Sequence, residues 1–511
     1  MFDRRQQIRN ILVGFGLIGY AKAVSRIRRR IKLACQVAAY PIKRCVYAAI
    51  ASIFPDHYWA FERLLSLSFS YRYRDPLKGA VGFINSFREL SRIKPAAIFA
   101  WRRQAYAAYW LVHDDSGMYR MMQAHIDAQE SFVRDHKLSA LGFRIADNLL
   151  FANYNVHAYL DTHIKAMQLG WQPKHRIFAL VGPENVVCNP VMLEYWRAYI
   201  DVIDDATAIK LLSPLRDLLT DDLSYVANLN GRAVFIEHAK HQVQKQWEAE
   251  KRAPLHRLSQ DDLEFGWEKL QELGIPRGSW FVSLHVRDPG CKLGSYQMKD
   301  DFDSYRNADI DSYALSIQSI VDQGGYVLRV GDPNMKPMVA RNGVIDYAHS
   351  HIRSNRMDIF LFTQCKCFVG TASGPIMTSV LFGVPTVMTN FAPMSARPHA
   401  GNCIFIPKLL WLKRENRYAS FKEVLSSDLG RIFSTPGYEE RGIEIIDNSP
   451  EELNDVVVEM LDRLNGHYEG VDDDEELQTR LGALYQEFSG YGDLGRIGGK
   501  FIKKYSAMGL I

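Results

Sequence analysis

The stretch Trp-Phe-Val-Ser-Leu-His-Val-Arg-Asp-Pro-Gly, residues 280–290, decides how the fold is interpreted. Its first seven residues are mostly β-branched or aromatic, which predicts a short buried strand, and the closing Pro-Gly predicts the turn that ends it. The strand therefore brings His285, Arg287 and Asp288 to its carboxyl end. In open α/β sheets ligands bind just outside that end, where a planar guanidinium is suited to holding phosphate oxygens. The alternative is a structural ion pair between Arg287 and Asp288 or another carboxylate.

The residues that follow alternate between predicted helices and strands, as in a nucleotide-binding α/β domain. One predicted strand runs into Gly331-Asp332-Pro333, and the next runs into Thr371-Ala-Ser-Gly-Pro375, which opens a helix. Ser373 stands at the N-cap position and Pro375 in the first turn, so the N–H groups of that turn face the same sheet edge as Arg287. The pattern predicts that a cation and a helix N-terminus converge on one anion.

The sequence resembles the donor domain of the GT-B fucosyltransferase-like superfamily, which includes α1,6- and protein O-fucosyltransferases. It is more similar to a bacterial family of glycosyltransferase-like proteins that share a His-Val-Arg-Asp strand, an Arg-Asn-x-Asp segment and a Ser-Gly-Pro turn. The resemblance covers roughly residues 140 to 410. It rests on these segments: His285-x-Arg287, Arg306 to Asp309, Gly331-Asp332-Pro333, Asp358-Ile-Phe-Leu-Phe-Thr-Gln-Cys365 and Val369-Gly-Thr-Ala-Ser373.

The chain departs from α1,6-fucosyltransferases at one position. Those enzymes carry a second Arg directly after the first, and this chain has Asp288 there. The departure bears on GDP-fucose as the donor more than on the fold.

The resemblance, together with strand and helix alternation from about residue 145, predicts an α/β fold. This fold is GT-B-like, with two Rossmann-like parallel-sheet domains facing a cleft and a helical N-terminal region. The expected parts are a basic amphipathic arm at 1–56, a helical subdomain at 57–140, an acceptor domain at 141–260, a nucleotide-sugar donor domain at 261–430 and C-terminal helices at 431–511. Within them the pattern predicts a helix at 190–203, a strand at 232–237, a polar connection at 238–262 and a last helix at 496–508.

The resemblance implies a set of donor-binding residues: His285, Arg287, Asp332, Asp358, Thr371, Ser373 and Gly374. Arg287 is expected to neutralise the donor diphosphate as the glycosidic bond breaks. Asp332 and Asp358 are expected to contact base or ribose, although turn and helix-cap roles explain them equally well.

Two residues compete for the role of catalytic base. His157 stands at a predicted helix start that faces the cleft, and its ordinary pKa lies near working pH. Asp288 is the other candidate. The alternative for His157 is that it is a polar surface residue with no catalytic role. The alternative for Asp288 is a salt bridge to Arg287 or a helix-terminal contact.

The sequence contains residues that can bind metals, but their spacing does not match that of known metal sites. Asp301-Phe-Asp303 spells the D-x-D of metal-dependent GT-A enzymes, yet it lies in a polar loop rather than after an apolar strand. His349-x-His351 and Cys365-x-Cys367 have gaps too short for ordinary zinc pairs. We therefore expect neither metal nor cofactor. The seven cysteines, an odd and dispersed set, indicate reduced thiols in the cytosol.

The N-terminal residues are strongly basic. Residues 1–44 carry eleven Lys or Arg and one acid, a net charge of +10, so the remaining residues carry −6 of the overall +4. From Val24 the apolar residues fall at helical spacing between arginines, which predicts that residues 1–54 lie on an anionic membrane surface. The alternative is an arm packed on its own protein or contacting RNA. Because no nucleic-acid-reading module follows, we expect no nucleic acid partner.

These observations predict a metal-independent glycosyltransferase at the cytoplasmic face of the cell membrane, bound peripherally. It would move a hexosyl or deoxyhexosyl group from a nucleoside diphosphate sugar, GDP-fucose-like by resemblance, to a glycan or lipid-linked acceptor in cell-surface polysaccharide assembly. The alternatives are a nonenzymatic scaffold of a membrane polysaccharide complex and another phosphate-handling enzyme, a kinase or a phosphatase.

Overall fold

The computed structural model divides the 511-residue chain into two compact units, Met1–Glu130 and Ser131–Ile511. The predicted membrane arm falls outside the described residues except at 47–48, and it stays a prediction. No helix among the described residues is both long and apolar enough to cross a membrane. The structure describes residues 47–48, 58–71, 76–94, 97–112, 114–138, 142–146, 151–154, 157–183, 185–215, 220–221, 223, 225–290, 302–339, 341–471, 473–489, 492 and 494–511.

The described part of the first unit is helical. The apolar stripe of α5 explains why: Ala80, Phe83, Ile84, Phe87 and Leu90 recur at helical spacing, and all five are buried. The helices are α4 (Tyr58–Tyr71), α5 (Pro76–Ile93), α6 (Ala97–Leu111) and α7 (Asp115–Asp135). The boundary between the units, after Glu130, falls within α7.

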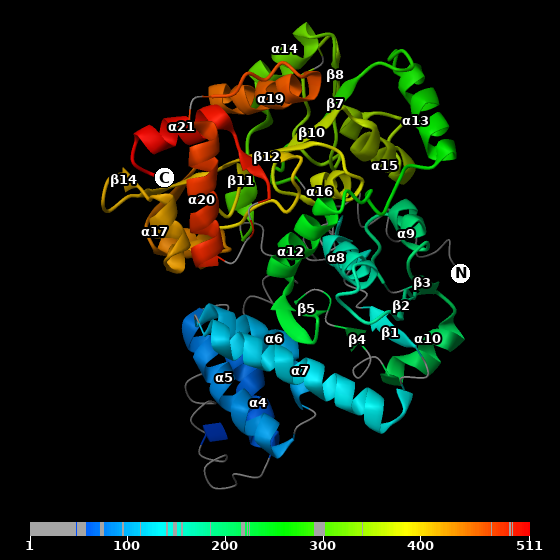
Figure 1. The fold of residues 1–511 in the computed structure, drawn as a ribbon, viewed down its shortest axis with the longest axis vertical. Helices are drawn as coiled ribbons and strands as arrows, with labels where there is room; N and C mark the ends of the chain where they lie inside the picture. Colours follow the sequence, from blue (N-terminus) through cyan, green and yellow to red (C-terminus); the bar gives the residue numbers. More distant parts are fainter. Residues whose placement is uncertain are drawn as a thin grey trace, which may run out of the picture. The chain divides into compact units, whose positions relative to one another are not determined.

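The second unit contains a smaller parallel sheet in the order β3-β2-β1-β4. Its strands are β1 (Phe143–Ala146), β2 (Arg176–Leu180), β3 (Asp201–Ile203) and β4 (Thr220–Asp221), and its helices are α8 (His157–Gln168), α9 (Pro190–Trp196) and α10 (Ala206–Leu212) with the short η4 (Ser213–Leu215). An antiparallel hairpin, β5 (Val226–Leu229) and β6 (Arg232–Phe235), and helix α12 (Ile236–Ala249) follow. Helix α12 packs beside α8 (Figure 1).

A larger parallel sheet of seven strands follows, in the order β16-β12-β11-β10-β7-β8-β9. Its strands are β7 (Phe281–His285), β8 (Tyr326–Arg329), β9 (Val344–Ile345), β10 (Cys367–Gly370), β11 (Thr386–Phe391), β12 (Cys403–Pro407) and β16 (Arg496–Ile497). Its helical segments are α13 (Gln260–Glu272), η5 (Ser304–Arg306), η6 (Ile310–Tyr313), α14 (Ala314–Asp322), η7 (Tyr347–His349), α15 (Asn355–Gln364) and α16 (Gly374–Leu381). The right-handed crossover rule places α14 and α16 on opposite faces, because their connections run in opposite directions along the sheet.

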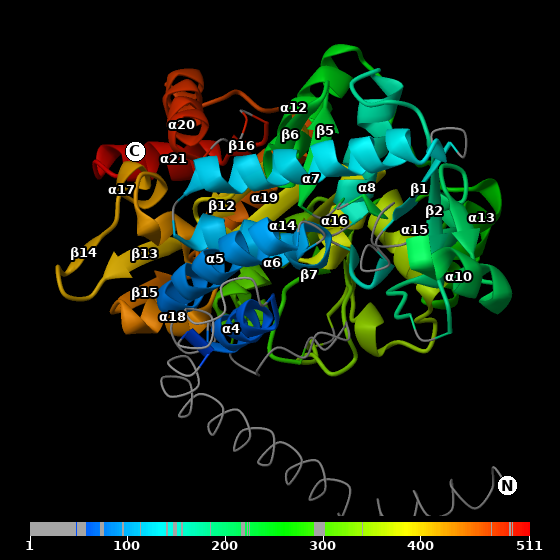
Figure 2. The same cartoon turned by 90° about the horizontal axis from the view of Figure 1, so that it is seen from below.

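The C-terminal part returns to the edge of this sheet. A three-stranded antiparallel sheet comes first, with β13 (Leu409–Leu412), β14 (Arg417–Tyr418) and β15 (Ile443–Ile446). The helical segments are α17 (Phe421–Leu425), η8 (Asp428–Arg431), α18 (Thr435–Glu440), α19 (Pro450–Asn465), α20 (Asp474–Ser489) and α21 (Gly499–Ala507). Helix α19 packs beside α14, and α20 lies beside α21 (Figure 2).

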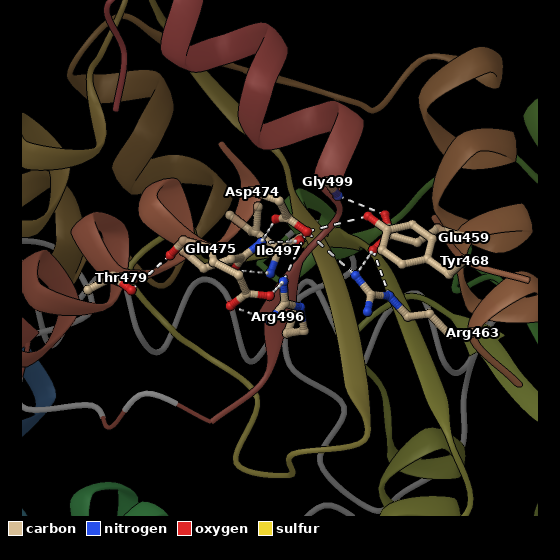
Figure 3. Close-up of polar contacts among 10 residues, drawn as sticks. Glu459, Arg463, Tyr468, Asp474, Glu475, Thr479, Arg496, Ile497 and Gly499 are labelled. Atoms are coloured by element: carbon tan, nitrogen blue, oxygen red, sulfur yellow. Dashed lines mark hydrogen bonds and ion pairs between the residues drawn. The ribbon is translucent and has the colours of Figure 1, made fainter. Parts of the chain in front are cut away.

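Edge strand β16 is held by a charged network between α19 and α20 (Figure 3). Arg496 pairs with Asp474 at 2.9 Å, and Asp474 also faces Arg463 at 3.6 Å. Arg463 pairs with Glu459 at 2.9 Å, and Glu459 accepts a hydrogen bond from the backbone N–H of Gly499 at 2.7 Å. Because both carboxylates are nearly buried, each one depends on its partners, and the network fixes the last strand to the sheet.

The predicted α/β fold with two parallel sheets and a helical N-terminal region is confirmed, but three elements were predicted wrongly. The helix predicted at 190–203 ends at Trp196, and the β-branched pair Val202-Ile203 belongs to β3 instead. The strand predicted at 232–237 is β6, which ends earlier and lies in a hairpin around Asn230-Gly231, both with positive φ, rather than in a parallel sheet.

The connection predicted at 238–262 is mostly helical. Helix α12 buries Ile236, Ala239, Val243 and Trp247 on one stripe, a spacing that its many polar residues obscure in the sequence. The helix predicted at 496–508 begins instead as strand β16, and α21 follows it. The domain boundaries stay predictions.

Burial of histidines makes the stability of the second unit depend on pH. Five buried histidines have lowered pKa values. Burial lowers the pKa of His399 well below its ordinary value, and it lowers the pKa of the other four to about 3: His157, His241, His256 and His285. Below about pH 6.5 the unfolded chain binds protons that the folded protein does not, so the stabilisation is present above that pH and is lost as the pH falls toward 3. Burial also raises the pKa of three carboxyls, which act in the opposite sense but are fewer: Asp161, Asp358 and Glu459.

We therefore expect the urea midpoint of unfolding to fall when the pH is lowered from about 7.5 to about 5.5. Each buried histidine should remove about 1.4 kcal/mol from the free energy of unfolding over this interval. A midpoint that stays constant or rises over the same interval contradicts neutral buried histidines.

Candidate functional site

The carboxyl ends of the seven strands meet along one edge, because the strands of the larger sheet run parallel. The chain order reverses between β7 and β10: β7 leads to β8 and β9 on one side, whereas β10 leads to β11 and β12 on the other. Connections diverge at such a switch point and leave a crevice outside the strand ends, where ligands bind. His285 ends β7 and Gly370 ends β10, and these two residues are register partners. His285, Arg287, Thr371 and Ser373 therefore lie at the sheet edge where ligands bind in such folds.

Hydrogen bonds lock the two strand ends together. The backbone N–H of Thr371 donates to His285 O at 3.0 Å, and the backbone N–H of Arg287 donates to Thr371 Oγ1 at 3.0 Å. Gly370 permits this approach, because a Cβ at that position would lie 2.3 Å from His285 O. The backbone that carries Arg287 is thus fixed to β10.

The guanidinium of Arg287 is held in a defined direction. Its Nη1 donates to Asp303 O at 2.9 Å and to Asn307 Oδ1. Both acceptors are neutral oxygens. The residue is half-buried, so the charged group stands between the protein interior and the solvent at the sheet edge.

Helix α16 begins at the same edge, and its N-cap side chain is turned away from the helix. Ser373 makes no capping hydrogen bond, and its Oγ instead lies 3.1 Å from Nδ1 of His285. Both side chains are buried. The partial positive charge of the helix N-terminus is therefore not offset by the usual side-chain oxygen, which favours an anion at this position.

Gly374 marks a contact between the two parallel-sheet parts. A Cβ at Gly374 would lie 2.9 Å from Cβ of Tyr154, so the glycine lets the loop after β1 approach α16 closely. Nδ2 of Asn189 donates to Tyr154 OH at 2.8 Å and to Asn355 O, at the start of α15, at 2.9 Å. The smaller sheet thus supplies a loop beside the candidate anion site.

Two further cations stand at this edge: Arg306, which the sequence analysis placed in a motif without a binding role, and Lys408, which it missed. Nη2 of Arg306 donates to Ala372 O at 2.5 Å, and within the described ranges this guanidinium forms no ion pair. Lys408 follows β12; its Nζ donates to Asn307 O and pairs with Asp447 at 2.7 Å. The rule that selected Arg287, a cation directly after a buried strand, would also have found Lys408.

Three arginines lie close enough to the buried ring of His285 to affect its pKa. Burial, and then the guanidiniums of Arg329, Arg287 and Arg306, lower its pKa to about 3. Burial lowers the pKa of Lys408 as well, and Arg287 acts in the same direction. An edge at which cations disfavour further positive charge is suited to binding an anion.

The two aspartates predicted at this edge shape loops. Asp288 accepts from the backbone N–H groups of Gly290 and Lys336, each at 2.7 Å, so it joins the loops after β7 and β8. Asp332 accepts from the backbone and side-chain amides of Asn334 at 2.9 and 2.6 Å, which closes its own turn. Their roles as base and donor ligand stay predictions.

Asp358 and Arg287 have different neighbours. Asp358 lies in the first turn of α15, where it accepts from Tyr347 OH at 2.8 Å. Burial raises the pKa of its carboxyl to about 6. Because its hydrogen-bond partner Tyr347 precedes α15 and does not contact Arg287, the expected contact with base or ribose also stays a prediction.

His157 is the first residue of α8 but does not open to solvent. Its side chain is 1% exposed and packs against the rings of Tyr154 and Trp196 at 6.1 and 6.0 Å. Nε2 lies 4.0 Å from Sγ of Cys188, whereas Nδ1 has no hydrogen-bond partner among the described residues. Because burial lowers the pKa of the ring to about 3, His157 is a weak base in this conformation.

The residues considered for metal binding do not form a described cluster. Among the described residues, no group of three or more His, Cys, Asp or Glu is placed to hold a metal ion. Asp301 lies outside those residues. Nδ1 of His349 lies 2.8 Å from Asp346, while Cys365 and Cys367 are buried. Independence from metal stays a prediction.

Comparisons with known proteins give only distant likenesses. No family model matches the sequence, and no curated protein matches it. Among solved structures, ADP-heptose LPS heptosyltransferase II of E. coli is similar with a TM-score of 0.32 and 11% identity, covering 52% of this chain and 90% of that one. A glycosyl transferase of family 9 from Veillonella parvula is similar with a TM-score of 0.33 and 8% identity, covering 52% and 85%. At TM-scores this low the likenesses carry no argument.

The lock between β7 and β10 can be tested by Thr371→Val. Valine keeps the branched shape but removes the oxygen that accepts from the Arg287 N–H, so we expect a loss of about 1 kcal/mol or more in the free energy of unfolding. Thr378→Val in α16 is the matched control, because Oγ1 of this buried threonine has no hydrogen-bond partner among the described residues. Urea unfolding measures the free energy of unfolding of both variants and of the wild type. If Thr371→Val is as stable as Thr378→Val, the hydrogen bond to Thr371 Oγ1 does not stabilise the contact between β7 and β10.

Proposed function

We propose that this protein is a GT-B-like, metal-independent glycosyltransferase. It transfers a hexosyl or deoxyhexosyl group from a nucleoside diphosphate sugar, with GDP-fucose as one candidate, to a glycan or lipid-linked acceptor of a cell-surface polysaccharide. Residues 1–54 hold it at the cytoplasmic face of an anionic membrane.

This proposal is supported by one arrangement: the segment that carries Arg287 and the segment that opens α16 follow neighbouring strands at the topological switch point of a parallel sheet. Arg287 is fixed through Thr371, and the N-cap side chain of α16 is drawn to His285. Arg306 adds a charge that has no ion-pair partner among the described residues. A diphosphate is the ligand whose charge and size suit several such donors at once.

The arrangement acts on the leaving group. As the glycosidic bond to the donor breaks, negative charge develops on the departing diphosphate, and fixed donors stabilise it without having to reorganise. The Arg287 guanidinium and the N–H groups of α16 supply this stabilisation, with the Ser373 hydroxyl beside them. Thr371 and His285 position these groups.

The acceptor hydroxyl must also lose a proton. Both oxygens of Asp288 already accept backbone hydrogen bonds, whereas Nδ1 of His157 has no partner among the described residues. We therefore assign the base to His157, in a state in which its ring is open to the acceptor. Exposure would return the pKa of the ring toward its ordinary value, close to working pH.

Thermal-shift measurements with nucleotides and nucleotide sugars test the proposal. We expect one nucleoside diphosphate, and the corresponding sugar donor, to raise the melting temperature of the full chain. At ligand concentrations a hundredfold above Kd the stabilisation should be about 2.7 kcal/mol. Because fixed cations supply the charge, EDTA should leave the shift unchanged.

The other outcomes identify the rivals. A shift only with ATP and magnesium indicates a kinase, and the absence of any shift indicates a scaffold. A diphosphate shift that EDTA abolishes and manganese restores places the enzyme in the metal-dependent class.

A further inference from the structure

Helix α8 carries a buried charged pair that the proposed function does not use. Asp161 and Lys165 lie four residues apart, and Nζ of Lys165 is 2.7 Å from Oδ2 of Asp161. Nζ also donates to Oε1 of Gln244, on α12, at 2.8 Å. By contrast, Oδ1 of Asp161 has no hydrogen-bond partner within the described ranges, although the residue is only 2% exposed. A buried carboxylate oxygen without a partner lowers stability, so its presence requires a specific explanation.

Three further buried polar atoms lack a partner in the part of the chain that the structure describes. They are Nδ1 of His157, Nε1 of Trp196 and Nε2 of His256. The rings of Trp196 and His256 are 4.3 Å apart, and the ring of His157 is 6.0 Å from that of Trp196. These side chains come from the start of α8, the end of α9 and the segment before α13.

His157 and Asp161 face the same neighbours. They are four residues apart on α8, so their side chains lie on one face of the helix in successive turns. Burial and then the charge of Asp161 raise the pKa of Tyr199, whose ring is 5.5 Å from His256. His256 in turn lies close enough to His157 to act, after burial, on the pKa of that ring. The unpartnered atoms therefore gather in one buried region.

We propose that Asp161 is a positioning residue for the proposed base: through one ordered water it holds the proton of the neutral His157 ring on Nδ1, so that Nε2 takes the proton of the acceptor hydroxyl. Side chains in successive turns have Cβ atoms about 5–6 Å apart, a separation that a buried water can bridge. A carboxylate only accepts, so the water donates to Oδ1 and accepts from the N–H at Nδ1. This inference rests on the proposed function and deepens it.

The second ring nitrogen lies on the less buried side. Nε2 is 4.0 Å from Sγ of Cys188, which is half-buried, so the ring opens to the acceptor on this side while Nδ1 keeps its link to Asp161. When Nε2 takes the hydroxyl proton, the hydroxyl oxygen bonds to the sugar, and the diphosphate leaves with the electron pair of the broken bond. The imidazolium that forms is stabilised by the carboxylate of Asp161, which Lys165 holds in place.

The position of the ring proton can be measured without any ligand. The ¹⁵N chemical shifts of the full chain, labelled at histidine, distinguish the two neutral tautomers, and His157→Gln identifies the signal of His157. We expect the wild type to carry the proton on Nδ1. We expect Asp161→Asn to shift it to Nε2, because the amide can donate to the water, which then donates to Nδ1. A wild-type ring that carries its proton on Nε2 overturns the inference.

Turnover tests the catalytic consequence. The measurement is release of nucleoside diphosphate from GDP-fucose or, if the thermal-shift panel selects another donor, from that one. Asp161→Asn should lower kcat per folded molecule about tenfold or more while KM changes less than about threefold, because the base loses its orientation and the donor contacts remain.

The pH profile separates positioning from a purely structural role. Because a nearby carboxylate raises the pKa of an imidazole, the acid limb of kcat should move by roughly one unit to lower pH in Asp161→Asn. Two other groups beside the ring stay neutral over this range: burial raises the pKa of Cys188 to about 12 and that of Tyr154 well above its ordinary value. Burial lowers the pKa of His256 to about 3, so it too stays neutral.

Glu237→Gln on α12 is the matched control. Glu237 belongs to another pair of a lysine and a carboxylate, but both of its oxygens have partners, Nζ of Lys240 at 2.6 Å and Tyr159 OH at 2.9 Å. This variant should keep the wild-type tautomer, kcat and acid limb. Asp161→Asn combined with Lys165→Met leaves no unpaired buried charge, so it covers the case in which the single variant does not fold. It should show the same changes as Asp161→Asn.

The outcomes separate the two claims. If the wild type is active and both Asp161 variants keep its kcat within about twofold and its acid limb, the role of Asp161 is overturned and the proposed function survives. If Glu237→Gln loses as much kcat per folded molecule, the loss does not report positioning, and the inference fails. A wild type that releases no nucleoside diphosphate from any donor overturns the proposed function and the catalytic role of Asp161. The ¹⁵N shifts still decide whether Asp161 sets the tautomer of His157.

Discussion

The structure depends on the contact between the ends of β7 and β10. The connections that follow these two parallel strands run to opposite sides of the sheet, so the chain segments must separate beyond the strand ends. Here hydrogen bonds hold the two segments together up to that point. Gly370 lets the backbones approach, and Thr371 then receives the N–H of Arg287 and donates its own to His285 O. The segments that carry Arg287 and open α16 are held at the same sheet edge as a result.

Several polar groups at this edge contact neutral partners. Arg306 donates to a backbone carbonyl, Asn307 offers oxygens rather than a carboxylate, and the Ser373 side chain contacts a neutral imidazole. The β16 network pairs its arginines with carboxylates, whereas Arg306 forms no ion pair within the described ranges. Perturbed or uncompensated charge is found at functional sites more often than elsewhere.

The sequence predicted the larger sheet better than the smaller one, for identifiable reasons. Its buried parallel strands are short apolar runs closed by Gly and Pro, so the strand ends and the residues after them could be located. Helix α12 was missed because polar residues outnumber the buried stripe that defines it, and β6 was misplaced because the Asn230-Gly231 turn was not used.

The candidate site was predictable only where it is local in sequence. His285, Arg287, Thr371 and Ser373 follow two strands and come together through hydrogen bonds, as the strand pattern indicates. Asn307 lies in the Arg-Asn-x-Asp segment and Lys408 directly follows a buried strand, but the sequence does not show that both contact the end of β7 from distant segments. The burial of His157 against Trp196 likewise depends on tertiary packing, which the start of a helix does not reveal.

The central claim is that Arg287 binds the leaving diphosphate through its planar geometry as well as its charge. Arg287→Lys keeps the charge but removes the planar pair of donors. The measurement is release of nucleoside diphosphate from the donor per folded molecule, with the melting temperature of the same preparation, and Arg277→Lys as the control because Arg277 pairs with Glu264 away from the crevice. We predict a loss of about 3 kcal/mol of transition-state stabilisation, on the order of a hundredfold in turnover, with a smaller loss of donor binding. A lower melting temperature with near-normal turnover per folded molecule would show that Arg287 is a structural residue and would contradict the account.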